Sequence, residues 1–168
     1  EHMNAWVWLL RDVSWDPDFP STAKTASKLF ELGQSKKVDG VIGINQWMLL
    51  ELVKGIGEVN IKGTEDTINS RNLISSLEEG TDVYGRIYMR LLFESILESL
   101  GSVSDPAQIL GISSAITEST KSKELLFYLE DIEIQSNIKS LGWSGEIRQH
   151  HGDYLYVVDS NVGWSKSD

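Results

Sequence analysis

The spacing of apolar residues along the chain first marks out short strand-like runs. Residues 4–10 (NAWVWLL), 38–44 (VDGVIGI) and 125–129 (LLFYL) are apolar runs of strand length. Residues 59–61 alternate apolar and polar positions, as a half-buried strand does, and residues 153–159 (DYLYVVD) form the clearest late strand. These patterns predict five strands spread over the whole chain.

Apolar residues at helical spacing lie between these strands. The predicted helices cover residues 21–32, 46–54, 64–79, 86–100, 106–119 and 131–141. Ser21 or Thr22, Asn45 and Asp105 are suited to cap the starts of three of them, and Gly33 is suited to end the first. Residues 80–85, which begin and end with glycine, predict a break before the helix at 86–100.

The order of these elements predicts a single α/β domain over residues 4–168. Strand, short helix and strand follow one another within residues 38–61, which is typical of a compact α/β unit. We therefore expect a mixed β-sheet flanked by helices on both faces, an α-β-α sandwich. Residues 1–3 (EHM) resemble a cloning scar. This interpretation makes the chain the C-terminal part of a longer protein.

The stretch RDVSWDPDFP, residues 11–20, raises the choice between a catalytic loop and a structural corner. Its two prolines favour extended backbone in the residues before them. We expect Trp15 and Phe19 to be buried as anchors, while the carboxylates cap turns and pair with Arg11. The three aspartates loosely resemble a calcium loop, but prolines intrude and the late glutamate is missing. The stretch is therefore predicted to be a corner, and no metal site is assigned.

Composition excludes several classes of function. The net charge of -10 makes nucleic acid a poor partner, because affinity for nucleic acid comes mostly from neutralising phosphates. The absence of cysteine excludes disulfides, thiolate nucleophiles and cysteine-based zinc sites. No apolar run approaches the about 20 residues that span a bilayer. We interpret the six tryptophans as core-packing residues and not as an exposed aromatic surface for sugar or lipid. We interpret the adjacent His150 and His151 as part of a polar turn and not as a metal chelate.

One group of charged residues could hold a phosphorylated ligand. Arg86 and Arg90 are four residues apart and therefore share a helix face, and Asp82 lies just before the predicted helix, where it could cap it. Two guanidinium groups near a helix N-terminus suit a pyrophosphate through charge and the helix dipole. The alternative is a solvated face on which these residues pair with Glu94 and with one another.

Four phrases spread along the chain resemble one bacterial family. They are LLRDVSWDPDFPSTAKTA, KKVDGVIGINQWMLLELVKGIGEV, ELLFYLEDIEIQSNIKSLGWSGEI and DYLYVVDSNVGWSKSD. Together they resemble the domain-of-unknown-function family 4012. The resemblance implies an extracytoplasmic domain of the cell envelope, attached to the membrane by an N-terminal transmembrane helix that this chain lacks.

A more distant resemblance is to the LytR-CpsA-Psr family of glycopolymer transferases. The segments VDGVIGINQWMLLELVKGIGEVNI and TDVYGRIYMRLL are similar to a strand-helix unit and a helix start in that family. The resemblance implies a LytR-CpsA-Psr-like core, a polyprenyl-pyrophosphate ligand held by Arg86, Arg90 and Asp82, and magnesium as a possible cofactor. Arg11 and Asp12 become secondary candidates beside that site. This chain departs from the family: the arginine spacing is four and not three, no Gln follows Arg90, and the family's early strand with Arg and Asp has no counterpart.

Two hypotheses of function follow, and the sequence leaves catalysis open. The first is a binding or structural module of the envelope, with a cell-wall glycan or a protein as its partner. The second is a phosphotransferase-like domain that handles glycopolymers linked to a polyprenyl pyrophosphate. The departures from the transferase pattern and the acidic balance favour the first for this chain. A cytosolic domain with no link to the envelope is a third possibility, which only the resemblance opposes.

Overall fold

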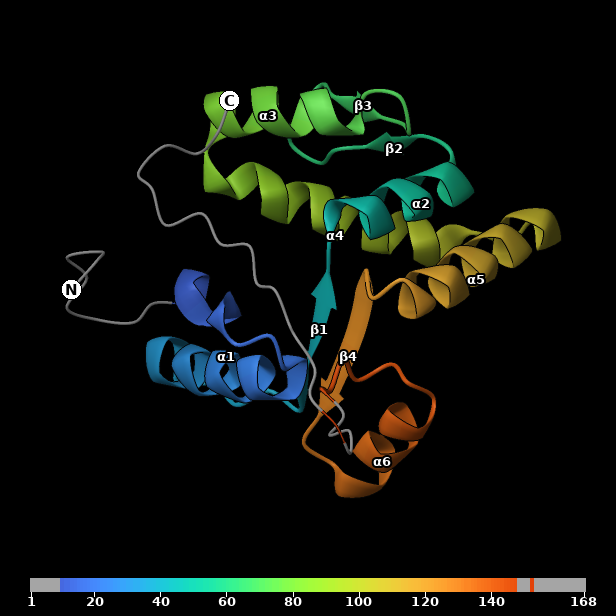
Figure 1. Ribbon diagram of the computed structural model, residues 1–168. Coiled ribbons are helices and arrows are strands. Elements are labelled where there is room, and N and C mark those ends of the chain that lie inside the picture. Colours follow the sequence, from blue (N-terminus) through green and yellow to red (C-terminus); the bar gives the residue numbers. More distant parts are fainter. Residues whose placement is uncertain (1–9, 148–151, 153–168) are drawn as a thin grey trace. The chain divides into compact units, whose positions relative to one another are not determined.

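The computed structural model describes residues 10–147 and residue 152, and this part of the chain is mixed α/β and mostly helical (Figure 1). The α/β prediction is confirmed at that level. The described strands form two separate two-stranded sheets. The chain divides into two compact units, one made of the described residues up to 42 and from 126 onward, the other of residues 43–125. The single domain over residues 4–168 stays a prediction.

The first unit contains a short 3-10 helix, two α-helices and a two-stranded sheet. These elements are η1 (Leu10–Trp15), α1 (Phe19–Gln34), α6 (Ile132–Ser140), β1 (Gly40–Ile44) and β4 (Leu125–Leu129). The last residues of β1 and the first residue of β4 are counted in the second unit. Backbone N–H groups of Glu130 and Asn45 donate to the carbonyls of Asp39 and Glu124, at 2.9 and 3.1 Å. These bonds follow opposite orders along the two segments, so β1 and β4 run antiparallel (Figure 1).

Asp18 starts helix α1. Its carboxylate accepts hydrogen bonds from the backbone N–H and the hydroxyl of Ser21, at 3.1 and 2.7 Å. The prediction that Ser21 or Thr22 caps this helix is therefore wrong. Phe19 and Pro20 belong to the first turn, where a proline costs nothing because the first helical N–H groups have no intrahelical acceptor.

The end of α1 also differs from the prediction. The helix continues through Gly33 to Gln34, and Ser35 is the residue that adopts a left-handed conformation, with φ of 53°. Gly33 is thus not the stop, because its backbone stays helical and Ser35 supplies the turn.

The stretch 11–20 is a corner in the part that the structure describes. The Asp16 carboxylate accepts a hydrogen bond from the backbone N–H of Asp18 at 2.9 Å, so these carboxylates cap turns as predicted. Phe19 is only partly buried, and the side chain of Trp15 lies outside the described residues.

The second unit contains four helices and a short hairpin in its described chain. Its elements are α2 (Gln46–Ile56), β2 (Val59–Asn60), β3 (Thr67–Ile68), α3 (Leu73–Tyr84), α4 (Arg86–Ser102) and α5 (Pro106–Lys121). Strands β2 and β3 pair antiparallel, with Val59 opposite Ile68. Asn45 and Asp105 cap α2 and α5 as predicted, because their side chains accept hydrogen bonds from backbone N–H groups in the first turn of each helix.

The region between β2 and α4 corrects two predictions. The helix predicted over 64–79 begins only at Leu73, because Thr67 and Ile68 pair with β2 instead. The break predicted over 80–85 is confined to Gly85, whose φ of 66° and ψ of -154° are essentially restricted to glycine. Gly80 remains helical and faces Tyr88, where an added Cβ would lie 2.2 Å from the ring.

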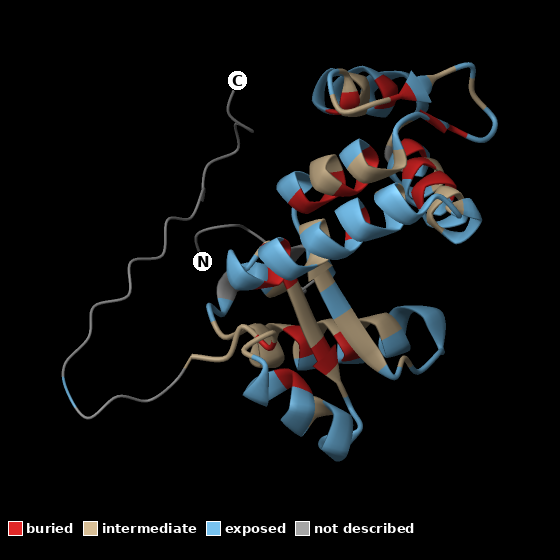
Figure 2. Ribbon diagram, turned by 90° about the vertical axis from the view of Figure 1, so that its right-hand side faces the viewer, coloured by how far each residue is buried: buried red, intermediate tan, exposed pale blue. Residues whose placement is uncertain are grey.

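Tyr88 is at the centre of the second unit's core. Its side chain is fully buried, along with aliphatic residues of α2, α3, α4 and the hairpin, which are among the residues marked red in Figure 2. Its hydroxyl donates to the Asp66 carboxylate at 3.0 Å. Burial is the larger cause and the hydrogen bond to Asp66 the second cause of a rise in the pKa of Tyr88 to about 12.

Several predictions fall outside the described residues. The strand at 153–159 and the His150–His151 pair are among them, as is the strand at 4–10 except for Leu10, which begins η1. In the part of the chain that the structure does describe, no helix is long and apolar enough to cross a membrane.

Candidate functional site

The residues predicted to bind pyrophosphate lie near the junction of α3 and α4. Asp82 lies exposed in the last turn of α3, and Gly85 is the residue that precedes α4, so Asp82 does not cap α4. Arg86 and Arg90 both belong to α4, four residues apart and therefore on one face. Arg90 is exposed, with its Nε 4.0 Å from the Glu94 carboxylate. The backbone thus brings the two arginines to one helix face, and their role in binding stays a prediction.

The secondary candidates, Arg11 and Asp12, lie in η1. Their side chains are outside the described residues, and so is that of Arg86. Their part in a site stays a prediction.

A shallow groove lies along α2 and α5 in the second unit. The two helices pack closely, and Gly55 is so near Ile112 that an added Cβ would lie 2.6 Å from its side chain. The groove has a volume of about 570 Å³. It is lined by Glu51, Lys54, Gly55, Gly111, Ser114, Ala115, Glu118, Ser119, Ser122 and Glu124. Small and polar side chains therefore form most of this surface.

The groove carries more negative than positive charge. Three glutamates and one lysine line it. Lys54 forms an ion pair with Glu51. Glu118 forms an ion pair at 2.7 Å with Lys121, which does not line the groove. Glu124 is 3.5 Å from the hydroxyl of Ser119. A ligand in this groove would meet hydroxyl and carboxylate oxygens that accept hydrogen bonds.

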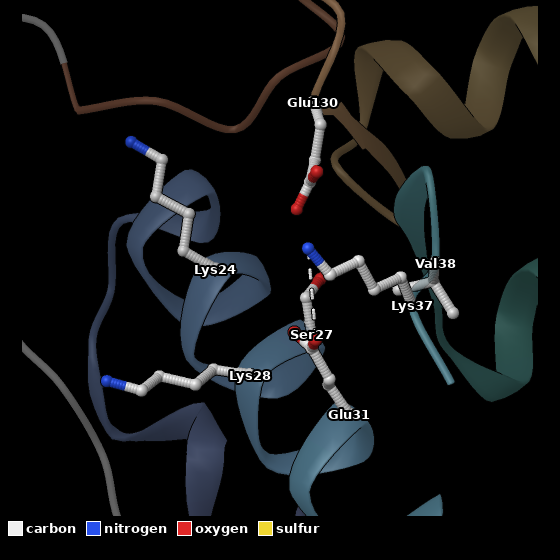
Figure 3. Close-up of a pocket in the computed structure, with 7 residues that line it drawn as sticks. All are labelled: Lys24, Ser27, Lys28, Glu31, Lys37, Val38 and Glu130. Atoms are coloured by element: carbon white, nitrogen blue, oxygen red, sulfur yellow. Dashed lines mark ion pairs between the residues drawn. The ribbon is translucent and has the colours of Figure 1, made fainter. Parts of the chain in front are cut away.

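A smaller cavity lies beside α1 in the first unit (Figure 3). Its volume is about 130 Å³. It is lined by Lys24, Ser27, Lys28, Glu31, Lys37, Val38 and Glu130. In the view of Figure 3 the Lys37 ammonium and the Glu130 carboxylate point toward the same space above Ser27. Three lysines and two glutamates thus surround one serine.

Sequence reasoning missed this cavity. Lys24 and Lys28 are four residues apart in α1, which signals a shared face beside Ser27. Glu130 comes from a distant part of the chain, and nothing local links it to α1. Only the tertiary structure brings the group together.

The described residues contain no cluster of three or more His, Asp or Glu side chains that could hold a metal ion. Magnesium therefore has no ligand set assigned in this part of the chain. Its participation stays a prediction made by analogy.

Comparison with known proteins places the chain in one family. Residues 1–84 match the model of a family described as "Protein of unknown function (DUF4012)". Searches of the curated proteins and of the solved structures found no significant match. The resemblance to LytR-CpsA-Psr enzymes stays a prediction. Because the family match covers half of the 168 residues, the chain belongs to the DUF4012 family, as its sequence phrases predicted.

Proposed function

We propose that this chain is a non-catalytic binding module of the bacterial cell envelope, and that it holds an uncharged glycan in the groove along α2 and α5. The observation that carries the proposal is the lining of that groove. It consists mainly of serines, glutamates and very small side chains.

The chemistry of the lining suits sugar hydroxyl groups. Serine hydroxyls and carboxylates accept hydrogen bonds from such donors, and bonds to a carboxylate are the stronger kind. Gly111 has nothing within 4 Å of the position of an added Cβ, so together with Ala115 it lets a ligand approach the backbone of α5 closely. The excess of glutamate over lysine in the lining disfavours an anionic pyrophosphate there, because like charges repel.

The size of the groove agrees with a ligand of one or a few sugar rings. Its volume of about 570 Å³ lies within the usual range for small-ligand sites, about 300–1,000 Å³. Its lining contains no Leu, Ile or Phe, which a polyprenyl chain would need for burial. The groove therefore favours a polar ligand over a lipid.

The cellular setting is inferred from the family resemblance. This resemblance supports an extracytoplasmic position and attachment to the membrane through an N-terminal transmembrane helix. A core related to that of LytR-CpsA-Psr proteins is part of this proposal and rests on the similar sequence segments alone.

A phosphotransferase-like function is the alternative. It is favoured by Arg86 and Arg90, which lie on one face at the beginning of α4. In that alternative they would neutralise a polyprenyl pyrophosphate, while Asp82 would hold magnesium or orient an arginine.

The test is thermal denaturation of the chain with two classes of ligand. A short oligosaccharide of N-acetylglucosamine, which carries no charge, is compared with a short-chain polyprenyl pyrophosphate, the latter with and without magnesium. Ser114→Trp fills the groove, and Ser113→Trp is the matched control, because Ser113 is exposed on the same helix outside the lining. Arg86→Ala/Arg90→Ala removes both arginines.

We expect the oligosaccharide to raise the melting temperature of the unmodified chain and of Ser113→Trp, since a ligand that binds only the folded state stabilises it. The Ser114→Trp variant should lose this shift. A shift with the pyrophosphate that Arg86→Ala/Arg90→Ala abolishes would favour the alternative instead. Absence of any response to oligosaccharides would contradict the glycan proposal.

A further inference from the structure

Ser27 carries a buried hydroxyl group that has no hydrogen-bond partner among the described residues. The residue is 9% exposed, and its Oγ makes no hydrogen bond within the described structure. A serine inside a helix commonly donates to the carbonyl four residues earlier, as Thr25 does to Ser21 at 3.0 Å. An unsatisfied buried polar group costs about 1–3 kcal/mol. Ser27 is one of the residues that line the cavity beside α1, so a small rotation of its side chain would let the hydroxyl bond to a molecule in that cavity.

Lysines are in excess around this hydroxyl. Lys28 has no ion pair with another described residue, and the Lys37 ammonium is 3.9 Å from Glu31, at the limit of an ion pair. Lys24 lies over the ring of Tyr128, 5.9 Å from its centroid. In the view of Figure 3, the Lys37 ammonium points toward the two glutamates, and those of Lys24 and Lys28 point away. Three lysines and two glutamates therefore line the cavity, in a chain whose net charge is -10. This local excess of positive charge attracts an anion.

The dimensions of the cavity limit the anion to a small one. Its volume of about 130 Å³ is below the about 300–1,000 Å³ that is usual for sites of drug-sized ligands. A tetrahedral oxyanion, with five heavy atoms, is much smaller than such ligands. A nucleotide or a sugar phosphate would have only its terminal phosphate inside.

We propose that the cavity formed by Ser27, Lys24, Lys28, Lys37 and Glu130 binds phosphate. The Ser27 hydroxyl donates a hydrogen bond to a phosphate oxygen, and the lysines supply the positive charge. Glu130 selects for phosphate over sulfate, because hydrogen phosphate has an O–H that can donate to a carboxylate and sulfate has none at neutral pH. This site belongs to the first unit and is independent of the glycan proposed for the second.

The test is a titration of the isotopically labelled chain with inorganic phosphate, followed by the backbone amide signals in NMR spectra. Ionic strength is held constant with sodium chloride, and sodium sulfate is the comparison anion. Ser27→Ala removes the hydroxyl, and Ser113→Ala is its matched control, since the Ser113 hydroxyl donates to the Ile109 carbonyl at 2.8 Å. Lys28→Gln is compared with Lys62→Gln, which removes a lysine that pairs with Glu98 in the other unit.

We expect saturable shifts of the amide signals around Ser27 with phosphate and weaker ones with sulfate. Ser27→Ala should weaken binding about tenfold, the effect of losing one hydrogen bond to a charged group. The variant should still fold, because it removes a hydroxyl that makes no hydrogen bond to the part of the chain that the structure describes. Lys28→Gln should also weaken binding, and the two control variants should bind as the unmodified chain does.

Two results would overturn the proposal. One is a response to phosphate no larger than that to chloride, which would mean that water alone fills the cavity. The other is equal phosphate affinity in Ser27→Ala. A parallel titration with glycerol 3-phosphate distinguishes the two sources of the ligand: equal affinity assigns the site to a phosphate monoester, and loss of binding assigns it to free phosphate.

Discussion

At the residue scale, Asp18 fixes the corner and the helix that follows it. One carboxylate oxygen accepts from Ser21, and the other accepts from the backbone N–H of Ile147 at 2.9 Å. Burial alone would raise the pKa of Asp18, but the bonds from Ile147 and Ser21, with the charge of Lys24, hold it below 3.8. One side chain thus starts α1 and ties it to a segment 129 residues later.

Replacing Asp18 by Ala should lower the free energy of unfolding by more than the about 1 kcal/mol that losing a helix cap typically costs, because the bond from Ile147 is lost as well. Urea denaturation at pH 7 measures the change. The control is Asp105→Ala, because the Asp105 cap accepts only from Ala107 and makes no bond to a distant segment. An equal loss in both variants would show that the bond to Ile147 adds nothing.

Asp18 also makes stability depend on pH. Because its folded pKa is lowered, the unfolded state binds more protons at acidic pH, so this contribution is present above about pH 4 and is lost as the pH falls below it. We expect Asp18→Asn to lose less stability than the unmodified chain between pH 5 and about pH 3. Urea denaturation across this range measures the difference, and parallel curves would contradict the role of the Asp18 charge.

At the element scale, the pairing of α2 with α5 depends on a glycine. Gly55 has no room for a side chain, since an added Cβ would lie 2.6 Å from Ile112. Gly111, on the partner helix, has nothing within 4 Å of the same position. The two helical glycines therefore differ in what an added methyl group would meet.

The matched substitutions should have opposite effects. Gly55→Ala should destabilise the chain by about 1–3 kcal/mol through overpacking, despite the higher helix propensity of alanine. Gly111→Ala should stabilise it by about 0.5–1 kcal/mol, because only the propensity changes. Thermal denaturation measures both, and a stabilising Gly55→Ala would show that the two helices separate easily.

At the scale of the whole molecule, residues 43–125 form a continuous segment with its own core. Its buried residues include Val53, Leu92 and Ile96, from two different helices. Near its two ends, the Asn45 N–H donates to the Glu124 carbonyl, so the segment begins and finishes at one place.

We expect residues 43–125 alone to fold and to unfold cooperatively on heating, as small domains of this size can. Circular dichroism measures helix content and the transition. Leu92→Ala, which truncates a side chain 1% exposed, should lower the midpoint, and Leu110→Ala, at 72% exposed, should leave it almost unchanged. A gradual, non-cooperative loss of helix signal would contradict an independent core.

The sequence by itself determined the family, the α/β composition and most helices. Asn45, Asp105 and Asp131 cap helices through neighbouring backbone N–H groups, so their roles are readable from adjacent residues. Tertiary structure decided the rest, since partners distant in sequence overrode local preference. Thr67 and Ile68 form a strand because they pair with β2. Gly80 remains helical and packs against Tyr88. Glu130 lies at the cavity beside α1, which Ser27 also lines. Capping is local in sequence, whereas pairing and cavity lining depend on residues that only the folded chain brings together.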